Sequence, residues 1–523
     1  MKKLISFLLI FSIVLSCGIV SAVHSVAKDT APIPTVYISG QGGKLYNVKN
    51  DRSSGLIYPL TIDKNDIFNK AMSLNVPYAT ALATGNWDSW CDRFVEICTD
   101  IFSPIALDKN GNPLGENGAA AHNIHHNYVC ENGEYELNAY PYNYDWRLDY
   151  EDVIDALHEH IIEVCNRTKT DKINLLGRCI GEDVVLAYIN KYGTGYINKI
   201  VLYSGGLDSF ELLGKIFTGD MSFDKDAIIR YLNNILDSAD FADDETMTVV
   251  SELAGLIEDI YGIEKFVDIL STYYSEVYEN VLPRILRETL GRYGSFWGLI
   301  GDEYYEDAKK FVFGGYEEEY AEIIKKIDYT HYNVVNKSRE IINKCLDNGV
   351  EVYIVAKYGL QMLPVIDNTS VQSDSFLELS SATGGAVCSP VTGKLSDKYI
   401  KNAKKKGTDK YISADMQVDC STAFLPDHTW CIKDCTHMNM PDCVNNLFAE
   451  IFSYDGYFTV FDNEKFPQYL LFDRKTQEIV PLTSENCNSN EEWQPKNVFQ
   501  RIFAMIKALC DKVVKLFAGL IKK

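Results

Sequence analysis

Short apolar segments rich in β-branched and aromatic residues alternate along the chain with segments of helical periodicity. Helical spacing of apolar residues is clearest over residues 150–166 and 183–192. This alternation is typical of a mostly parallel sheet covered by helices, and it predicts an α/β fold. The expected strands are residues 34–38, 135–140, 172–176, 199–203, 350–355 and 429–432.

Two regions interrupt the alternation. Residues 210–345 are acidic, rich in Tyr and Leu, and show helical spacing without an obvious strand, so we expect a helical cap inserted into the sheet. Residues 46–132 form a smaller, lid-like insertion. The sheet core is therefore expected in two parts, residues 23–209 and residues 346–490.

The N-terminus has the pattern of a secretory signal. Lys2 and Lys3 precede an apolar run, and the small residues before Val23 provide a cleavage site, so residues 1–22 are expected to be removed. The apolar run is too short to span a bilayer. Cleavage before Cys17 with lipoprotein anchoring is the less favoured alternative, because the preceding residues match that signal poorly. The pattern predicts a secreted or extracellular protein.

The overall charge excludes one class of partner. The 523 residues carry 50 Lys and Arg against 73 Asp and Glu, a net charge of −23, with 46% hydrophobic residues. A globular chain of this composition lacks the basic surface that nucleic-acid binding requires.

The C-terminal end differs in charge from the rest of the chain. After a linker from residue 491, residues 498–523 contain six basic residues and one Asp, together with an apolar stripe at helical spacing. We expect an amphipathic helix here. Docking on the protein body and contact with an anionic membrane surface both fit this pattern.

The segment from Gly177 to Gly181, with the sequence Gly-Arg-Cys-Ile-Gly, joins an apolar strand to a helix. This is the context of a nucleophile elbow, in which the central Cys179 occupies a tight turn and the flanking glycines allow the strand and helix to approach. The helix N-terminus favours negative charge on the sulfur. A buried structural cysteine in a βα turn is the alternative interpretation.

Two further motifs occur in order with this elbow, at residues 37–43 and at residues 141–147, the latter reading Pro-Tyr-x-x-Asp-Trp-Arg. Together they resemble the lecithin:cholesterol acyltransferase-like (LCAT-like) family of α/β-hydrolases over most of residues 33–445. The cap and tail match poorly. The resemblance implies an α/β-hydrolase fold and acyl-ester chemistry on lipids, as expected for phospholipases and lipid acyltransferases with a Ser-His-Asp triad.

The chain departs from that family at two positions. Cys179 stands where the family has Ser, as in the elbows of polyhydroxyalkanoate synthases and dienelactone hydrolases, and a cysteine can form an acyl-thioester intermediate. Glu182 stands where a small residue is usual. Its charge is expected to disfavour the thiolate and to increase the dependence on a histidine base.

The remaining triad members are predicted from their order in α/β-hydrolases, where an acid and then a histidine follow the nucleophile. The segment around Asp374 is similar to the family's Gly-Asp-Gly-Thr-Val block, so we assign the acid to Asp374. His437 follows the strand expected at residues 429–432, and we prefer it as the base to His428, which precedes that strand. The reserve candidates for the acid are Asp367, Asp415 and Asp419.

The oxyanion hole is expected from the backbone N–H groups of Ile180 and Gln41. Gly40 and Gly42 would let the loop after the first strand approach the substrate carbonyl. Asp145 and Arg147 are expected to form an ion pair that holds this loop.

Other arrangements of the 14 cysteines are less favoured. Cys431, Cys435, His437 and Cys443 lack the spacing of a common zinc module, so no metal is expected, and no cofactor motif is present. Export would permit disulfides, including one between Cys91 and Cys98, although pairing cannot be read from the sequence.

These observations predict an exported hydrolase or O-acyltransferase that acts on a lipid or other acyl ester through Cys179, His437 and Asp374. A catalytically inactive lipid-binding or surface-binding homologue is the alternative from another class. A thioesterase or a polyhydroxyalkanoate-type acyl polymerase is a further alternative.

Overall fold

The computed structural model describes residues 33–40, 43–60, 64–119, 126–129, 136–222, 227 and 274–489. The predicted signal segment, Gln41, Gly42 and the predicted C-terminal helix lie outside these residues.

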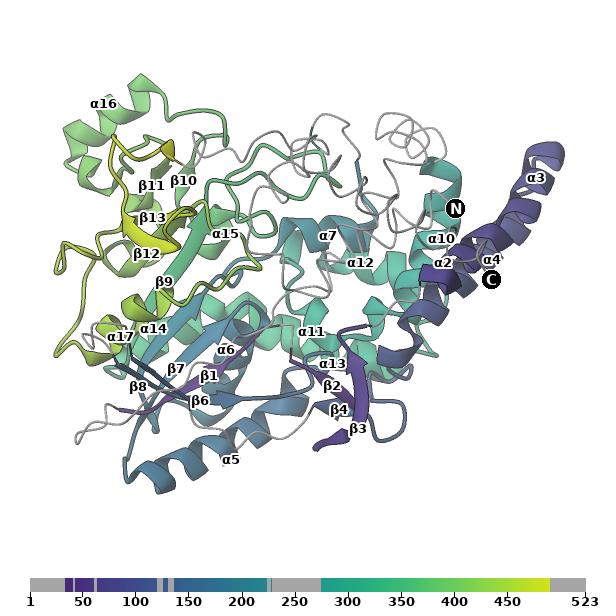
Figure 1. Cartoon of the computed structure of the whole chain (residues 1–523), viewed down its shortest axis with the longest axis horizontal. Coiled ribbons are helices and arrows are strands. Elements are labelled where there is room, and N and C mark those ends of the chain that lie inside the picture. Colours follow the sequence, from purple (N-terminus) through teal and green to yellow (C-terminus); the bar gives the residue numbers. More distant parts are fainter. Residues whose placement is uncertain are drawn as a thin grey trace, which may run out of the picture.

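Within the described residues, the core is a nine-stranded sheet with the strand order β14-β13-β12-β9-β8-β7-β1-β6-β5 (Figure 1). All adjacent pairs from β6 to β13 are parallel, whereas β5 and β14 join the two edges in antiparallel orientation. This is the α/β-hydrolase fold expected from the sequence. The strands are β1 (Thr35–Ile38), β5 (His126–Val129), β6 (Glu136–Tyr142), β7 (Ile173–Arg178), β8 (Ile197–Tyr203), β9 (Glu351–Tyr358), β12 (Thr429–Lys433), β13 (Tyr469–Asp473) and β14 (Glu478–Pro481).

Helices cover both faces of this sheet. Alternate strand residues point to opposite faces, so Leu175 packs in one apolar cluster and Leu176 in another. The first cluster includes apolar residues of α5 (Glu151–Thr168), α6 (Ile180–Tyr192) and α14 (Ser338–Asp347). The second includes apolar residues of α17 (Val444–Ser453). Burial on both faces explains why the central strands are almost entirely apolar.

Each strand predicted from the apolar pattern is present, with its ends shifted by a few residues. The pattern did not indicate β13 or β14, and β5 lies within the range expected for the lid-like insertion although it pairs with β6. The remainder of that insertion holds a small antiparallel sheet and a group of helices. These are β2 (Leu45–Val48), β3 (Asp51–Tyr58), β4 (Gly118–Ala119), α2 (Lys64–Ser73), α3 (Asn75–Thr84), α4 (Asp88–Phe102) and η1 (Ser103–Ile105).

Every regular element that the structure describes in the region predicted as a cap is a helix. Trp297 packs against Phe217 and Phe313, with ring centroids 5.2 and 5.4 Å apart, and thereby joins three cap helices. Helix α14 overlaps the predicted cap range but packs against α6 and β9 of the core. The cap elements are α7 (Glu211–Thr218), α10 (Tyr274–Glu288), η3 (Leu290–Arg292), α11 (Gly294–Trp297), α12 (Asp302–Phe313), α13 (Ala321–Asn333) and η4 (Val335–Lys337).

The long connection between β9 and β12 carries short elements beside the sheet. They are α15 (Leu379–Ala382), β10 (Val387–Cys388), α16 (Asp397–Lys406), η5 (Asp409–Tyr411), β11 (Val418–Asp419), η6 (Cys420–Thr422) and η7 (Pro426–His428). In the described part of the chain, no helix combines the length and apolar character needed to cross a membrane.

Helix α6 crosses strand β1 so closely that Gly181 has no room for a side chain. A Cβ at Gly181 would lie 2.2 Å from the backbone oxygen of Ile38, in a buried strand that cannot move aside. We expect Gly181→Ala to lower the free energy of unfolding by about 1–3 kcal/mol, measured by urea denaturation. Gly195→Ala is the matched control, because nothing lies within 4 Å of its added Cβ. Equal stability of Gly181→Ala and the wild-type protein would contradict this packing.

Candidate active site

Cys179 forms the turn between β7 and α6, with φ 52° and ψ −127°. A positive φ in a residue other than glycine costs about 1–3 kcal/mol and persists only where the surroundings enforce it. Here the Cys179 N–H donates to Tyr203 O at 3.0 Å, and Cys179 O accepts from Glu182 N at 2.9 Å. A Cβ at Gly177 would lie 2.7 Å from Gly181 O, so the turn also needs glycine there. The local geometry is that of a nucleophile elbow.

The structure brings together the three residues predicted as the triad. His437 Nε2 lies 3.2 Å from Cys179 Sγ, and His437 Nδ1 lies 2.7 Å from Asp374 Oδ2. Each of the three residues is at most 4% exposed. They come from the segments that follow β7, β9 and β12, whose carboxyl ends share one edge of the parallel sheet.

Asp374 is fixed by its own backbone surroundings. Its Oδ1 accepts hydrogen bonds from Phe376 N at 3.1 Å and Leu377 N at 2.8 Å, which leaves Oδ2 for His437. The backbone N–H of His437 also donates to the backbone oxygen of Asp374 at 2.7 Å. The two loops that carry the acid and the histidine are therefore tied together by both backbone and side-chain contacts.

The charges of the three side chains favour a thiolate–imidazolium pair. Burial by itself lowers the pKa of His437, but the Asp374 carboxylate and the Cys179 sulfur outweigh it and raise this pKa to about 9. Burial raises the pKa of Cys179, whereas His437, Arg178 and the Ile180 N–H together lower it below 9. Both directions favour the sulfur anion over the neutral thiol.

Glu182, whose charge the sequence analysis considered, is buried beside the elbow. Its side chain is 2% exposed, and burial raises the pKa of Glu182 well above its usual value. This direction favours the neutral carboxyl group, which would repel a Cys179 thiolate less than a carboxylate does. The expectation that Glu182 disfavours the thiolate assumed an ionised carboxylate, and it stays a prediction.

The other candidates for the acid and the base form contacts away from Cys179. Asp367 is exposed and forms an ion pair with Lys215. Asp415 pairs with a buried lysine at 2.8 Å, and Asp419 accepts a hydrogen bond from a tyrosine at 2.9 Å. His428 Nδ1 lies 2.9 Å from the backbone oxygen of Phe458.

Gly40, which follows β1, lies directly against Cys179. A Cβ at Gly40 would lie 3.3 Å from Cys179 Sγ and 2.6 Å from Cys179 Cβ. The Ile180 N–H, one of the two predicted oxyanion donors, helps to lower the pKa of Cys179. Gln41 and Gly42 lie outside the described residues, and their part in an oxyanion hole stays a prediction.

Asp145 and Arg147 form the buried ion pair, with Arg147 Nη2 2.5 Å from Asp145 Oδ2. Arg147 Nη1 also donates to Ile105 O at 3.1 Å, which connects this motif to the lid-like insertion. Trp146, between them, donates from Nε1 to Gly43 O at 3.1 Å and so holds the segment that follows the β1 loop.

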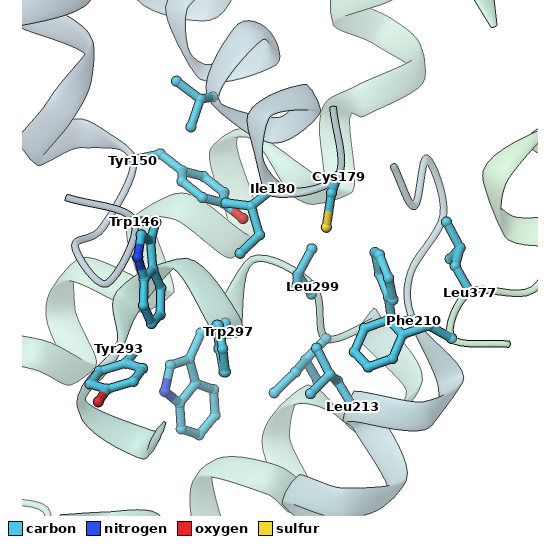
Figure 2. Packing of buried hydrophobic residues seen from close by; sticks show 14 of the residues in the cluster. Trp146, Tyr150, Cys179, Ile180, Phe210, Leu213, Tyr293, Trp297, Leu299 and Leu377 are labelled. Atoms are coloured by element: carbon cyan, nitrogen blue, oxygen red, sulfur yellow. The ribbon is translucent and has the colours of Figure 1, made fainter. Parts of the chain in front are cut away.

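Apolar side chains surround Cys179 on its cap side. Figure 2 shows the Cys179 sulfur directed toward the side of the cluster that contains Ile180, Leu299 and Phe210. The rings of Phe210 and Phe376 lie 6.2 and 5.2 Å from the His437 ring and cover it. Sequence reasoning did not identify this apolar shell, because its members come from loops and cap helices far apart in the chain.

The cysteines of the disfavoured zinc arrangement have other neighbours. Cys431 Sγ lies 3.5 Å from Cys420 Sγ, whereas Cys435 Sγ faces the backbone oxygens of Thr436 and Asn439. No group of three His, Cys, Asp or Glu side chains in the described ranges is arranged to hold a metal ion. Both ring nitrogens of His437 are used by Asp374 and Cys179.

No family model and no curated protein matches this chain. Among solved structures, it aligns with the crystal structure of homoserine O-acetyltransferase from Bacillus anthracis at 7% identity and a TM-score of 0.12. The alignment covers 37% of this chain and 64% of that enzyme, which is less than two thirds of its length. So slight a similarity carries no argument about activity. The strand order and the elbow define the class, an α/β-hydrolase fold.

The charge distribution around His437 predicts its titration. We expect the His437 imidazole to titrate near pH 9, and Cys179→Ala to lower this midpoint because the sulfur anion that favours the imidazolium is removed. Because the pKa of His437 is higher in the folded state than in the unfolded state, its protonation stabilises the folded state. This stabilisation is complete below pH 6.5, the ordinary pKa of histidine, and is lost as the pH rises through about 9. NMR of the imidazole resonances measures the midpoint directly.

His428 provides the internal control for that titration. Burial lowers its pKa from 6.5, and it lies away from the sulfur, so its midpoint should be the same in both proteins. A His437 midpoint at or below 6.5 in the wild-type protein would contradict the ion pair.

Proposed function

We propose that this protein is an acyl-ester hydrolase or O-acyltransferase that uses Cys179 as its nucleophile. The observation that carries the proposal is the continuous contact from Cys179 Sγ to His437 at 3.2 Å and from His437 to Asp374 at 2.7 Å, at a nucleophile elbow. The nucleophile, base and orienting acid thus have the mutual geometry that covalent acyl transfer needs.

The reaction would proceed through an acyl-thioester. The Cys179 sulfur attacks the ester carbonyl, and the carbonyl oxygen becomes an oxyanion beside the Ile180 N–H. The C–O bond then breaks, and His437 donates its proton to the departing alkoxide. In the second half, His437 accepts a proton from water or an alcohol, which attacks the thioester and releases Cys179. Asp374 orients the ring and stabilises the imidazolium.

The surroundings of the nucleophile support an apolar acyl chain as the substrate group. Phe210, Leu213, Trp297 and Leu299 belong to the same buried apolar cluster as Cys179 (Figure 2). Such side chains favour hydrocarbon over a charged acyl group. This agrees with the lipid chemistry implied by the resemblance to the LCAT-like family, and we include that class in the proposal.

Replacement of the nucleophile tests the activity. We expect purified protein to release alcohol from long-chain acyl esters, and Cys179→Ala to lose at least about a thousandfold in kcat, because no other thiol contacts His437 in the described structure. Cys98→Ala is the matched control, since Cys98 is equally buried but lies in α4. Full activity in Cys179→Ala would contradict the proposal. Absence of any ester turnover, with binding of the same esters retained, would favour an inactive lipid-binding protein.

Added alcohol separates hydrolysis from acyl transfer. If a second alcohol reacts with the thioester faster than water does, product analysis will show a new ester whose amount increases with the alcohol concentration. The rate at which Cys179 is acylated should not change. Free acid as the sole product at every alcohol concentration would identify a hydrolase.

We also propose that the protein is exported and contacts anionic membranes through residues 498–523, on the basis of the terminal sequence patterns. Deletion of these residues should weaken binding to vesicles that contain anionic lipid and leave binding to neutral vesicles unchanged, as measured by co-sedimentation. Unchanged binding to anionic vesicles would reject the membrane contact.

A further inference from the structure

Arg178 immediately precedes the nucleophile and is the last residue of β7. Its side chain is 4% exposed and crosses to the histidine loop, where Nη2 donates to His437 O at 2.9 Å and to Met438 O at 3.1 Å. Its charge also interacts with the Tyr37 hydroxyl. A buried guanidinium therefore holds the backbone of the residue that contacts the sulfur.

Lys357 approaches the same loop from strand β9. Its side chain is 1% exposed, and Nζ donates to Thr436 O at 3.0 Å, Asn439 O at 2.6 Å and His437 O at 3.4 Å. The ammonium also lies 4.7 Å from the centre of the Tyr203 ring. All three donor positions of the ammonium are thus used by backbone oxygens.

Neither cation has a carboxylate ion-pair partner within 4.0 Å among the described residues. By contrast, the buried side chains of Arg147, Lys199 and Lys433 each pair with Asp or Glu. Burial of an unpaired cation is costly unless other negative charge compensates it. Arg178 and Lys357 instead contact the backbone oxygens of residues 436–439.

The negative and titratable groups that face the two cations come from every adjacent element. Arg178 interacts with Tyr37 of β1, Tyr203 of β8 and Cys179. Lys357 interacts with Cys435, Asp374 and Cys179, and also with the positive charge of Arg178. Burial lowers the pKa of Lys357 to about 8, so it is mainly protonated at neutral pH. Cys179 is the group that both cations share.

We propose that Arg178 and Lys357 are positioning residues which clamp residues 436–439 so that His437 faces Cys179, and whose charges stabilise the Cys179 thiolate. The clamp rests on the proposed use of Cys179 as a nucleophile, and it assigns two residues to that chemistry beyond the triad. A hydroxyl nucleophile has no anionic resting state, so two cations beside the elbow fit a cysteine better than a serine.

Titration of the Cys179 thiolate tests the clamp without any substrate. The ultraviolet thiolate absorbance is followed against pH, with the Cys179→Ala version of each variant subtracted to remove tyrosine and the other cysteines. Arg178→Met should raise the midpoint by about one pH unit, a roughly tenfold loss of thiolate below the midpoint, and Arg178→Lys should restore most of it. Lys357→Met should raise the midpoint by a smaller amount.

Lys199→Met is the matched control. Lys199 is also buried, also donates to three backbone oxygens, and lies near the start of β8, toward the opposite end of the strands from the site. Its replacement should reduce stability and leave the Cys179 midpoint unchanged. If Arg178→Met does not fold, the Cys179 midpoints of Lys357→Met and Lys199→Met are compared instead. A higher midpoint in Lys357→Met alone would then support the clamp.

The two sets of outcomes are separable. An unchanged midpoint in Arg178→Met and Lys357→Met, or an equal shift in Lys199→Met, would overturn the clamp even if Cys179 turns over esters. A raised midpoint in both clamp variants, with Lys199→Met unchanged, supports the clamp even if no ester is a substrate, and in that case the proposed function alone fails.

Discussion

The close crossing of helix α6 over strands β1 and β7 is the constraint on which the candidate site depends. Side chains are excluded at Gly40, Gly177 and Gly181, where an added Cβ would lie between 2.2 and 2.7 Å from a neighbouring atom. Because the backbones meet there, Cys179 is held at a positive φ with its sulfur beneath the β1 loop. Looser packing would let the turn relax and would separate the sulfur from the Ile180 N–H and from His437.

Charge compensation then explains how so many polar groups stay buried in one place. Asp374 accepts from two backbone N–H groups and faces His437, whose raised pKa favours an imidazolium beside Cys179. Burial raises the pKa of Glu182 well above its usual value, which favours its neutral form. The charged groups of the site thus depend on one another, and loss of one member would leave another buried with less compensation.

The parts of this arrangement that depend on local sequence were predictable, and the parts that depend on distant contacts were not. The elbow follows from a strand, two glycines and a helix within a short segment, and Asp374 and His437 follow from their order after later strands. Arg178 was visible in the motif, but its partners lie about 260 residues away along the chain. The pKa of Glu182 depends on burial by tertiary packing, which no local pattern reports. Strand β5 is likewise defined by its pairing with β6.

Peptide mass spectrometry of Cys179 after brief incubation with a set of acyl esters tests the central claim most directly. The account predicts a hydroxylamine-sensitive mass increase equal to the acyl group, located on Cys179 and absent from the other cysteines, which is strongest for apolar chains and lost in His437→Ala. An unmodified Cys179 under conditions where the protein turns over the same esters, or an acyl group on another residue, would contradict it.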